Sequence, residues 1–342
     1  MANYLIAALY HFVELDDHEA WRDRLEAFCA EREIVGTLLL AREGINGTIA
    51  GPEQGVRELL ALLRADARFA DLIHKEAWSE LQPFYRLKVK LKKEIVTLGV
   101  PDLKTAEMVG DYLEPEDWNT LIQDPDVVLI DTRNDYEVGI GTFKNAINPQ
   151  TTSFTEFPEW VAQQRQPGGL LEGNPRVAMF CTGGIRCEKS TAFMRSQGFD
   201  EVYHLKGGIL RYLEELPVEQ SLWEGDCFVF DERVAVTHGL EPGEHNRFCR
   251  ACRMPLNQAD CEHAHFEEGV SCRHCYGTFS AEKLERLRER QKQTRIAQER
   301  NSRHIAAPLE ELKAAKRARQ DELIEHSRQQ QALKEAETPT NN

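Results

Sequence analysis

The chain has 342 residues, of which 41% are hydrophobic and 29% are charged. This length predicts two or three domains, and this composition excludes a disordered or fibrous protein. No apolar run reaches the roughly 18–20 residues that a membrane span needs, and residues 1–20 lack the basic start and cleavage-site pattern of a signal peptide. We therefore expect a cytoplasmic protein with no membrane partner.

The net charge of −15 is unevenly distributed along the chain. Residues 281–342 hold 14 basic and 11 acidic side chains, a net charge of +3, which leaves −18 for residues 1–280. This acidity argues against a generally basic nucleic-acid binder. A local basic patch can still bind phosphates, because salt limits each contact to charges within about 8–10 Å.

Residues 1–100 have the pattern of an α+β domain whose order, strand–helix–strand–strand–helix–strand, is ferredoxin-like. Tyr4, Tyr10 and Phe12 are expected in its core. The predicted elements are a strand over 4–12, a helix from Asp16 or Asp17 to Arg32, a hairpin over 34–50 that turns at 44–47, a helix over 52–65, and a closing strand over 85–97.

The closing strand alternates between two kinds of side chain. Leu87, Val89 and Leu91 share one face. The other face carries four basic residues within roughly 20 Å, and Lys93 lies beside them. These four are Arg86, Lys88, Lys90 and Lys92. They are our candidate phosphate-binding surface; the alternative is the solvated face of an edge strand that lysines protect from pairing with other strands.

Residues 101–220 change to short apolar strands separated by helices, which predicts an α/β domain with a parallel sheet. The three strands cover 127–130, 176–180 and 202–205. They end in Asp131, in Cys181 and in the run Lys206-Gly207-Gly208. Because open α/β sheets carry their sites at the carboxyl ends of the strands, we expect the functional site there.

The loop after the second of these strands has the composition of a reactive-cysteine loop. Its glycines let the backbone amides turn inward, and the amides together with the start of a helix, expected near Cys187, favour a thiolate over a thiol. A guanidinium close to the sulfur, and Lys189 as a further charge, add to this effect. The loop consists of Cys181, Thr182, Gly183, Gly184, Ile185 and Arg186.

Other interpretations of these residues remain open. Cys181 could be a structural cysteine that packs as a small apolar side chain. Asp131 could brace the loop through its backbone or through Arg186, or only cap the turn after its own strand. Cys187 could be a resolving thiol or simply pack in the first turn of the helix, and we favour packing.

Residues 221–280 form a small cysteine-rich module. Cys249 and Cys252 make one C-x2-C pair, Cys272 and Cys275 make another, and 19 residues separate the pairs, which is the spacing of a structural zinc site. Four cysteine ligands would leave no open position for catalysis. The alternatives are that Cys261, His263 or His265 replaces one ligand, or that the cysteines are reduced without metal.

Residues 281–342 have the composition of a charged helical tail. A helix is predicted over 280–300, and Pro308 separates it from a second helix over 309–326. We expect solvated helices that lead into a partly disordered end; the alternative is a docking segment for tRNA or a partner.

The C-x4-R spacing from Cys181 to Arg186 resembles the active loop of the rhodanese sulfurtransferase superfamily. Related phosphatases have C-x5-R, so the shorter loop argues for a persulfide sulfur and against a phosphate. Asp131-Thr132-Arg133, Glu137 and the pair Gly207-Gly208 match the same superfamily.

Longer runs are more specific. FCTGGIRCEKS over 180–190, HLKGGI over 204–209 and FVFDER over 228–233 resemble the rhodanese-related tRNA uridine-34 hydroxylases. The likeness covers residues 1 to about 280, includes REGINGT over 42–48, and implies an acylphosphatase-like N-terminal domain. It implies oxygen-dependent 5-hydroxylation of the wobble uridine in the tRNA anticodon loop, with Cys181 essential and molecular oxygen as co-substrate. No organic cofactor is evident, and the sequence leaves the oligomeric state open.

Two other functions compete with this one. A rhodanese-type sulfurtransferase would use the same cysteine to carry a persulfide to a tRNA, a protein or a small acceptor. A noncatalytic adaptor would only bind RNA or protein, and the intact cysteine, glycines and arginine of the loop argue against it.

Overall fold

The structure, a computed structural model, describes residues 4–80, 82–101, 103–243 and 246–299. Residues up to Ser280 form one compact unit, and helix α10 (Ala281–Glu299) belongs to a second. Within the described ranges, no helix is long and apolar enough to cross a membrane. The predicted helix over 309–326 lies outside the described residues, and the domain boundaries near 100, 220 and 280 stay predictions.

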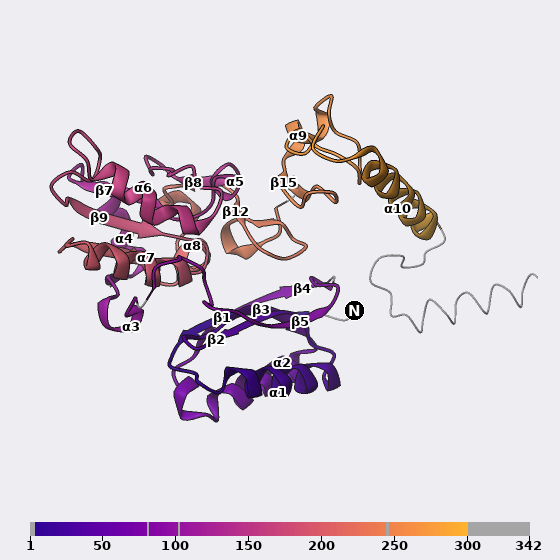
Figure 1. Cartoon of the computed structure of the whole chain (residues 1–342), viewed down its shortest axis with the longest axis horizontal. Helices are drawn as coiled ribbons and strands as arrows, with labels where there is room; N and C mark the ends of the chain where they lie inside the picture. Colours follow the sequence, from indigo (N-terminus) through magenta and orange to yellow (C-terminus); the bar gives the residue numbers. More distant parts are fainter. Residues whose placement is uncertain (1–3, 81, 102, 244–245, 300–342) are drawn as a thin grey trace, which may run out of the picture. The chain divides into compact units, whose positions relative to one another are not determined.

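The N-terminal sheet has five strands in the order β4-β1-β3-β2-β5. Helices α1 and α2 cover the same face of it (Figure 1). In α2 the buried Val56, Leu59, Leu60 and Leu63 recur at helical spacing and fill the core against the sheet. The bounds are β1 Tyr4–Phe12, α1 His18–Glu31, β2 Val35–Ala41, β3 Gly44–Gly51, α2 Glu53–Arg64, β4 Ile73–Ser79 and β5 Leu87–Leu91.

The predicted closing strand was wrong in its role. The strand that completes the ferredoxin-like order is β4, which pairs antiparallel with β1. The run predicted over 85–97 is only β5, a fifth strand that pairs parallel with β2 and forms the edge of the sheet. Strand β4 escaped prediction because its sequence, IHKEAWS, is polar and mostly half-buried.

The turn predicted at 44–47 was also wrong, because these residues lie inside β3 and the chain reverses at Arg42 and Glu43. The glycines serve close strand packing instead. A β-carbon on Gly44 (φ 132°) would lie 2.0 Å from His11 O, and one on Gly47 would lie 2.2 Å from Thr37 O. Side chains there would push the neighbouring strands apart.

The central domain contains a four-stranded parallel sheet in the order β6-β10-β9-β7. The three predicted strands are present, and β6 was not predicted. Strands β9 and β7 are apolar and largely buried, as expected of a sheet that helices cover on both faces. The bounds are α3 Thr105–Met108, β6 Asp111–Leu113, α4 Pro115–Ile122, β7 Val127–Asp131, α5 Asp135–Val138, α6 Phe157–Gln164, β9 Arg176–Phe180, α7 Ile185–Ser196, β10 Val202–Leu205 and α8 Gly208–Glu215.

The rest of the unit consists of short pairs of strands. Strand β11 (Trp223–Gly225) pairs with β8 (Gly141–Phe143), which ties the segment after α8 to the central domain. Two further pairs and one short helix follow. They are β12 (Cys227–Phe228) with β13 (Ala235–Val236), β14 (Arg247–Phe248) with β15 (Pro255–Leu256), and α9 (Gln258–Glu262).

Candidate active site

The predicted reactive cysteine lies at the carboxyl end of the central sheet. Cys181 directly follows β9, and α7 begins at Ile185, two residues earlier than predicted. Gly184 occupies the N-cap position with φ 101°, a conformation that glycine adopts without strain. The loop is therefore tight enough for its amides to face the sulfur.

The Cys181 side chain is 1% exposed and borders the cavity described below. Its Sγ accepts a hydrogen bond from the backbone N–H of Gly184 at 3.1 Å. Burial opposes ionisation and is the largest influence on the pKa. The Cys187 thiol, the Arg186 charge and the backbone N–H groups of both residues outweigh it and lower the pKa of Cys181 to about 6. At neutral pH the sulfur is thus mainly a thiolate.

Arg186 is fixed by a carboxylate at the start of the neighbouring helix α5. Its Nη1 lies 2.6 Å from Glu137 Oε2 and its Nη2 lies 2.7 Å from Glu137 Oε1. Burial raises the pKa of a carboxyl, but the charge of Arg186 and its hydrogen bonds dominate and lower the pKa of Glu137. The pair therefore carries opposite charges inside the protein, as a bidentate contact favours.

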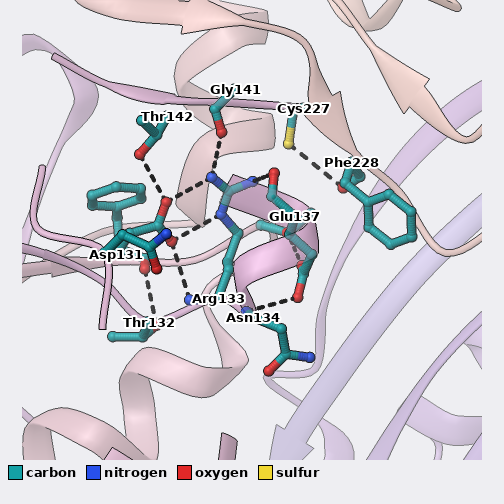
Figure 2. A network of polar contacts seen from close by, with 12 residues as sticks. Asp131, Thr132, Arg133, Asn134, Glu137, Gly141, Thr142, Cys227 and Phe228 are labelled. Atoms are coloured by element: carbon teal, nitrogen blue, oxygen red, sulfur yellow. Dashed lines mark hydrogen bonds and ion pairs between the residues drawn. The ribbon is translucent and has the colours of Figure 1, made fainter. Parts of the chain in front are cut away.

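The predicted brace through Asp131 was wrong. Asp131 Oδ2 instead accepts hydrogen bonds from Arg133 Nη2, at 2.6 Å, and from the Thr142 hydroxyl. Arg133 also donates a hydrogen bond to the carbonyl oxygen of Gly141, as Figure 2 shows. Both side chains of this pair are fully buried. Both carboxylate oxygens of Asp131 are thus occupied by Arg133 and Thr142 and do not bind the cysteine loop. The carboxylate that holds Arg186 of this loop belongs to Glu137 instead.

Cys187 is fully buried beside the reactive cysteine. Its thiol is one of the groups that lower the pKa of Cys181. Its Sγ also lies 3.8 Å from Thr132 Oγ1. Burial and the neighbouring sulfur raise the pKa of Cys187, so it remains a thiol while Cys181 ionises. This position is compatible with both predicted roles, packing and resolving.

Lys189 does not add its charge to the loop as predicted. Its Nζ lies 2.6 Å from Glu94 Oε2 and 2.8 Å from Glu43 Oε2. The side chain is almost fully buried. Two carboxylates therefore already balance the ammonium.

The glycine pair after β10 supports the cysteine loop by close contact. A β-carbon on Gly208 (φ 67°) would lie 2.5 Å from Cys181 O, and the N–H of Ile209 donates to that oxygen at 3.0 Å. Only a residue without a side chain fits at 208. The two predicted segments, Cys181–Arg186 and Gly207–Gly208, thus meet in one place.

A cavity of about 1040 Å³ opens over the cysteine loop. Residues of β1 and β4, the loop itself and the segment 229–240 contribute to its wall. This volume lies at the upper end of the roughly 300–1,000 Å³ that is usual for small-molecule sites. The cavity places the reactive sulfur within reach of a ligand, which argues against a purely structural cysteine.

Sequence reasoning missed a carboxylate with two phenols in this cavity. Tyr10 donates a hydrogen bond to Glu188 Oε1 at 3.0 Å, and Tyr112 donates to Glu188 Oε2 at 2.7 Å. Tyr10 was expected in the core, but its hydroxyl lies against Gly184 of the loop. No spacing signal could reveal this, because β1 contacts α7 over 178 residues of sequence.

Four cysteines gather as the paired spacing predicts. The Sγ atoms of Cys249, Cys252, Cys272 and Cys275 all lie within 4.8 Å of one another, and three of the separations are 3.7–3.9 Å. Four thiolates at about 2.3 Å from a tetrahedral zinc ion lie roughly 3.8 Å apart. Three of the separations match this value, and the others, all within 4.8 Å, need to change by at most about 1 Å to complete the tetrahedron.

The predicted basic strand face is partly confirmed in its local geometry. Leu87 and Val89 pack on the N-terminal core, whereas Leu91 is 38% exposed. Lys88 is half-buried, and the other three basic residues are exposed. Burial lowers the pKa of Lys88, and the charges of Arg86, Lys90 and Arg253 lower it further. Positive charge therefore concentrates around this edge strand.

Comparison with known proteins agrees with this geometry. Residues 4–95 match the model of the UPF0176 acylphosphatase like domain, and residues 114–215 match that of the rhodanese-like domain. A tRNA uridine(34) hydroxylase from Acaryochloris marina is 56% identical over 307 residues, which cover 90% of this chain and 97% of the relative.

Two further relatives carry the same name. The one from Agrobacterium fabrum is 57% identical over 303 residues, which cover 89% of this chain and 95% of the relative. The one from Albidiferax ferrireducens is 57% identical over 310 residues, which cover 91% of this chain and 97% of the relative. At this identity over nearly the whole of both chains, this chain belongs to the tRNA uridine(34) hydroxylase family of enzymes.

Proposed function

We propose that this chain hydroxylates C5 of uridine 34 in tRNA, with Cys181 as the residue that reacts with the base. The observation that carries the assignment to Cys181 is a thiolate, held by backbone amides and a braced guanidinium, at the wall of a large cavity. The anticodon loop is the part of tRNA that reaches this cavity. Its uridine is unpaired, so the enzyme only has to unstack the base.

Cys181 would act by adding to C6 of the uracil ring. The new S–C6 bond takes its electron pair from the thiolate, and the C5=C6 electrons move toward C5 and the C4 carbonyl. C5 thereby becomes nucleophilic toward a peroxide-level oxygen species formed from molecular oxygen, the co-substrate, and an external two-electron donor. Cleavage of the O–O bond would transfer one oxygen atom to C5 and release the other as water. Loss of the C5 proton and expulsion of the Cys181 thiolate from C6 would then restore the C5=C6 bond. A pKa of about 6 supports the addition to C6, because the attacking sulfur is already ionised at neutral pH.

Nucleoside mass spectrometry tests this function. tRNA from cells that lack the gene should contain no 5-hydroxyuridine at position 34; wild-type protein should restore it, and Cys181→Ser should not. tRNA carrying 5-fluorouridine should trap a covalent adduct on Cys181. Thiolated nucleosides in place of hydroxylated ones would favour a sulfurtransferase and would contradict the proposal.

The four-cysteine cluster is proposed to hold one structural zinc ion. Cys249, Cys252, Cys272 and Cys275 would be its ligands, and zinc would supply cross-linking rather than chemistry, because no coordination position stays open. The module has only short strands and a small core, so a metal would provide much of its stability.

The basic face of β5 is proposed to contact tRNA phosphates. Within the described residues, no carboxylate forms an ion pair with Arg86, Lys88, Lys90 or Lys92, which leaves these charges available. A phosphate backbone that crosses an edge strand would meet several of them at once. This surface and the cavity would bind different parts of the same tRNA.

A further inference from the structure

The cavity wall contains one basic side chain that differs from the others. Four of the Lys and Arg residues in the wall are paired with carboxylates. They are Arg186 with Glu137, Lys206 with Glu114, Arg211 with Glu114 and Glu215, and Arg233 with Asp231. Lys75 of β4 lines the same cavity, and its Nζ has no hydrogen-bond partner within the described part of the chain.

Lys75 lies close to the reactive loop. A β-carbon on Gly207 would be 3.1 Å from Lys75 Nζ, and the next residue, Gly208, packs on the carbonyl of Cys181. The ammonium is buried, and this burial lowers its pKa to about 8. The charges of Glu214 and Glu215 act on this ammonium, but within the described residues no carboxylate forms an ion pair or a hydrogen bond with it. A buried cation without such a contact costs free energy, so its position indicates an anionic ligand that arrives from outside.

The same wall contains an exposed aromatic side chain. Phe230 is 59% exposed and borders the cavity, although large apolar side chains are usually buried. It packs edge-on against Phe228 with 5.0 Å between the ring centroids. One face of the ring therefore remains available to a planar ligand.

Ion pairs hold the loop that carries Phe230. Asp231 pairs with Arg233 at 2.7 Å, and Glu232 pairs with Arg250 at 2.7 Å and Arg253 at 3.1 Å. These ion pairs hold the backbone that follows Phe230. Exposed aromatic rings beside positive charge are the usual platforms for nucleobase stacking.

We propose that Lys75 and Phe230 form a nucleotide-binding subsite, in which Lys75 contacts a backbone phosphate next to uridine 34 and Phe230 stacks on a neighbouring base. The proposal rests on the proposed function, since it takes the ligand to be the anticodon loop. Lys75 and Phe230 would hold the phosphate and one neighbouring base. The uracil of uridine 34 would then be the base that is free to enter the cavity and reach Cys181.

Binding of an anticodon stem–loop RNA to the full chain in the Cys181→Ser background tests the phosphate contact, because no turnover interferes. Lys75→Met should weaken binding about tenfold, as expected for one charge-assisted hydrogen bond, and should reduce the slope of log affinity against log salt by about 0.7–0.9. Lys75→Arg should retain most of the affinity. Lys104→Met is the matched control, because Lys104 is exposed and paired with Glu107.

A neutral methylphosphonate at the linkage before or after nucleotide 34 identifies the phosphate. At one of these linkages it should weaken binding to the parent protein and leave binding to Lys75→Met unchanged. The phosphate contact is wrong if Lys75→Met keeps the full affinity and salt slope. It is also wrong if both methylphosphonates weaken RNA binding to Lys75→Met as much as they weaken binding to the parent protein. Thermal unfolding adds a check: removal of an unpaired buried charge should leave the melting temperature unchanged or raised.

Phe230→Leu should weaken binding roughly tenfold, and Phe230→Tyr should not, because stacking requires an aromatic ring. With an abasic site at nucleotide 33 or 35, the penalty of Phe230→Leu should disappear for one of the two RNAs. Trp78→Leu is the control, because Trp78 is 48% exposed and lies outside the cavity wall. An equal penalty on intact and both abasic RNAs would overturn the stacking contact.

These binding results are independent of catalysis. If Cys181→Ser protein still produced 5-hydroxyuridine, the proposed role of Cys181 would fail, whereas the phosphate and abasic cycles would still report on the subsite. If instead the cycles fail while wild-type protein hydroxylates uridine 34, the subsite is wrong and the function stands.

Discussion

Glu137 holds Arg186 through both carboxylate oxygens, at 2.6 and 2.7 Å, and neither side chain has more than 8% of its surface exposed. Arg186 lies in the first turn of α7, and Glu137 ends the first turn of α5. The acid therefore fixes the guanidinium close enough to the loop sulfur for its charge to lower the pKa of Cys181. The position of the guanidinium, and not only its charge, sets the ionisation of Cys181.

Removal of the acid should disrupt both stability and activity. Glu137→Ala leaves a buried guanidinium unpaired, which should lower the free energy of unfolding by about 3–5 kcal/mol. Glu137→Gln keeps the shape and a hydrogen bond and should lower it less. Urea unfolding measures the loss, and 5-hydroxyuridine in tRNA should fall in the same order.

The matched control is Glu107→Ala, which removes a surface ion pair with Lys104. Exposed pairs contribute little, so its unfolding free energy should change by less than about 1 kcal/mol. Equal effects of Glu137→Ala and Glu107→Ala would show that the Arg186 contact is not structural.

The pH dependence of alkylation should reveal the lowered pKa of Cys181. Only the thiolate reacts with iodoacetamide, so the rate at Cys181 should rise with pH through a midpoint near 6 and level off above pH 7. Cys187→Ala removes a group that lowers the pKa of Cys181 and should move the midpoint upward. Mass spectrometry of the modified peptide gives the rates, and a midpoint near 8.5 in the wild type would contradict an activated thiolate.

Much of the fold could be predicted because its signals are local. The strands that end at Asp131 and Cys181 are continuous apolar runs, and the helix over residues 53–64 has a clear apolar face. Strand β4 was missed because an edge strand with half-buried polar residues has no alternation to detect. The glycines of β3 were read as a turn because glycine favours both turns and close strand packing.

The candidate site was predictable only where one loop supplies it. Cys181 and Arg186 lie in one run, and the paired cysteine spacing identifies the four-cysteine cluster. Their partners come from distant elements: Glu137 is 49 residues from Arg186, and Tyr10 is 178 residues from Glu188. Whether Asp131 or Glu137 binds Arg186 depends on which of the two acids already binds Arg133. Only the packed structure shows that Arg133 binds Asp131.

The cysteine cluster should bind one zinc ion per chain. Metal analysis of purified protein should give a ratio near one, and Cys252→Ser should lower it strongly. A chelator that removes the ion should unfold residues 246–280 and leave the central sheet folded, which hydrogen exchange can measure. Cys261→Ser is the control, since Cys261 lies outside the group of four sulfurs, and loss of zinc in this variant would revise the ligand set.

Charge reversal on β5 should show whether its lysines bind tRNA or only protect an edge strand from pairing with other strands. Lys88→Glu with Lys90→Glu should weaken tRNA binding and flatten its salt dependence, because each lost phosphate contact lowers the slope by about 0.9 for duplex and 0.7 for single-stranded RNA. Leu87 and Val89 still pack on the core, so the unfolding free energy should change by less than about 1 kcal/mol. Lys104→Glu reverses a charge away from this strand and controls for net charge. Unchanged tRNA affinity in the double variant would remove the β5 face from the binding surface and leave its lysines with the role of guarding an edge strand.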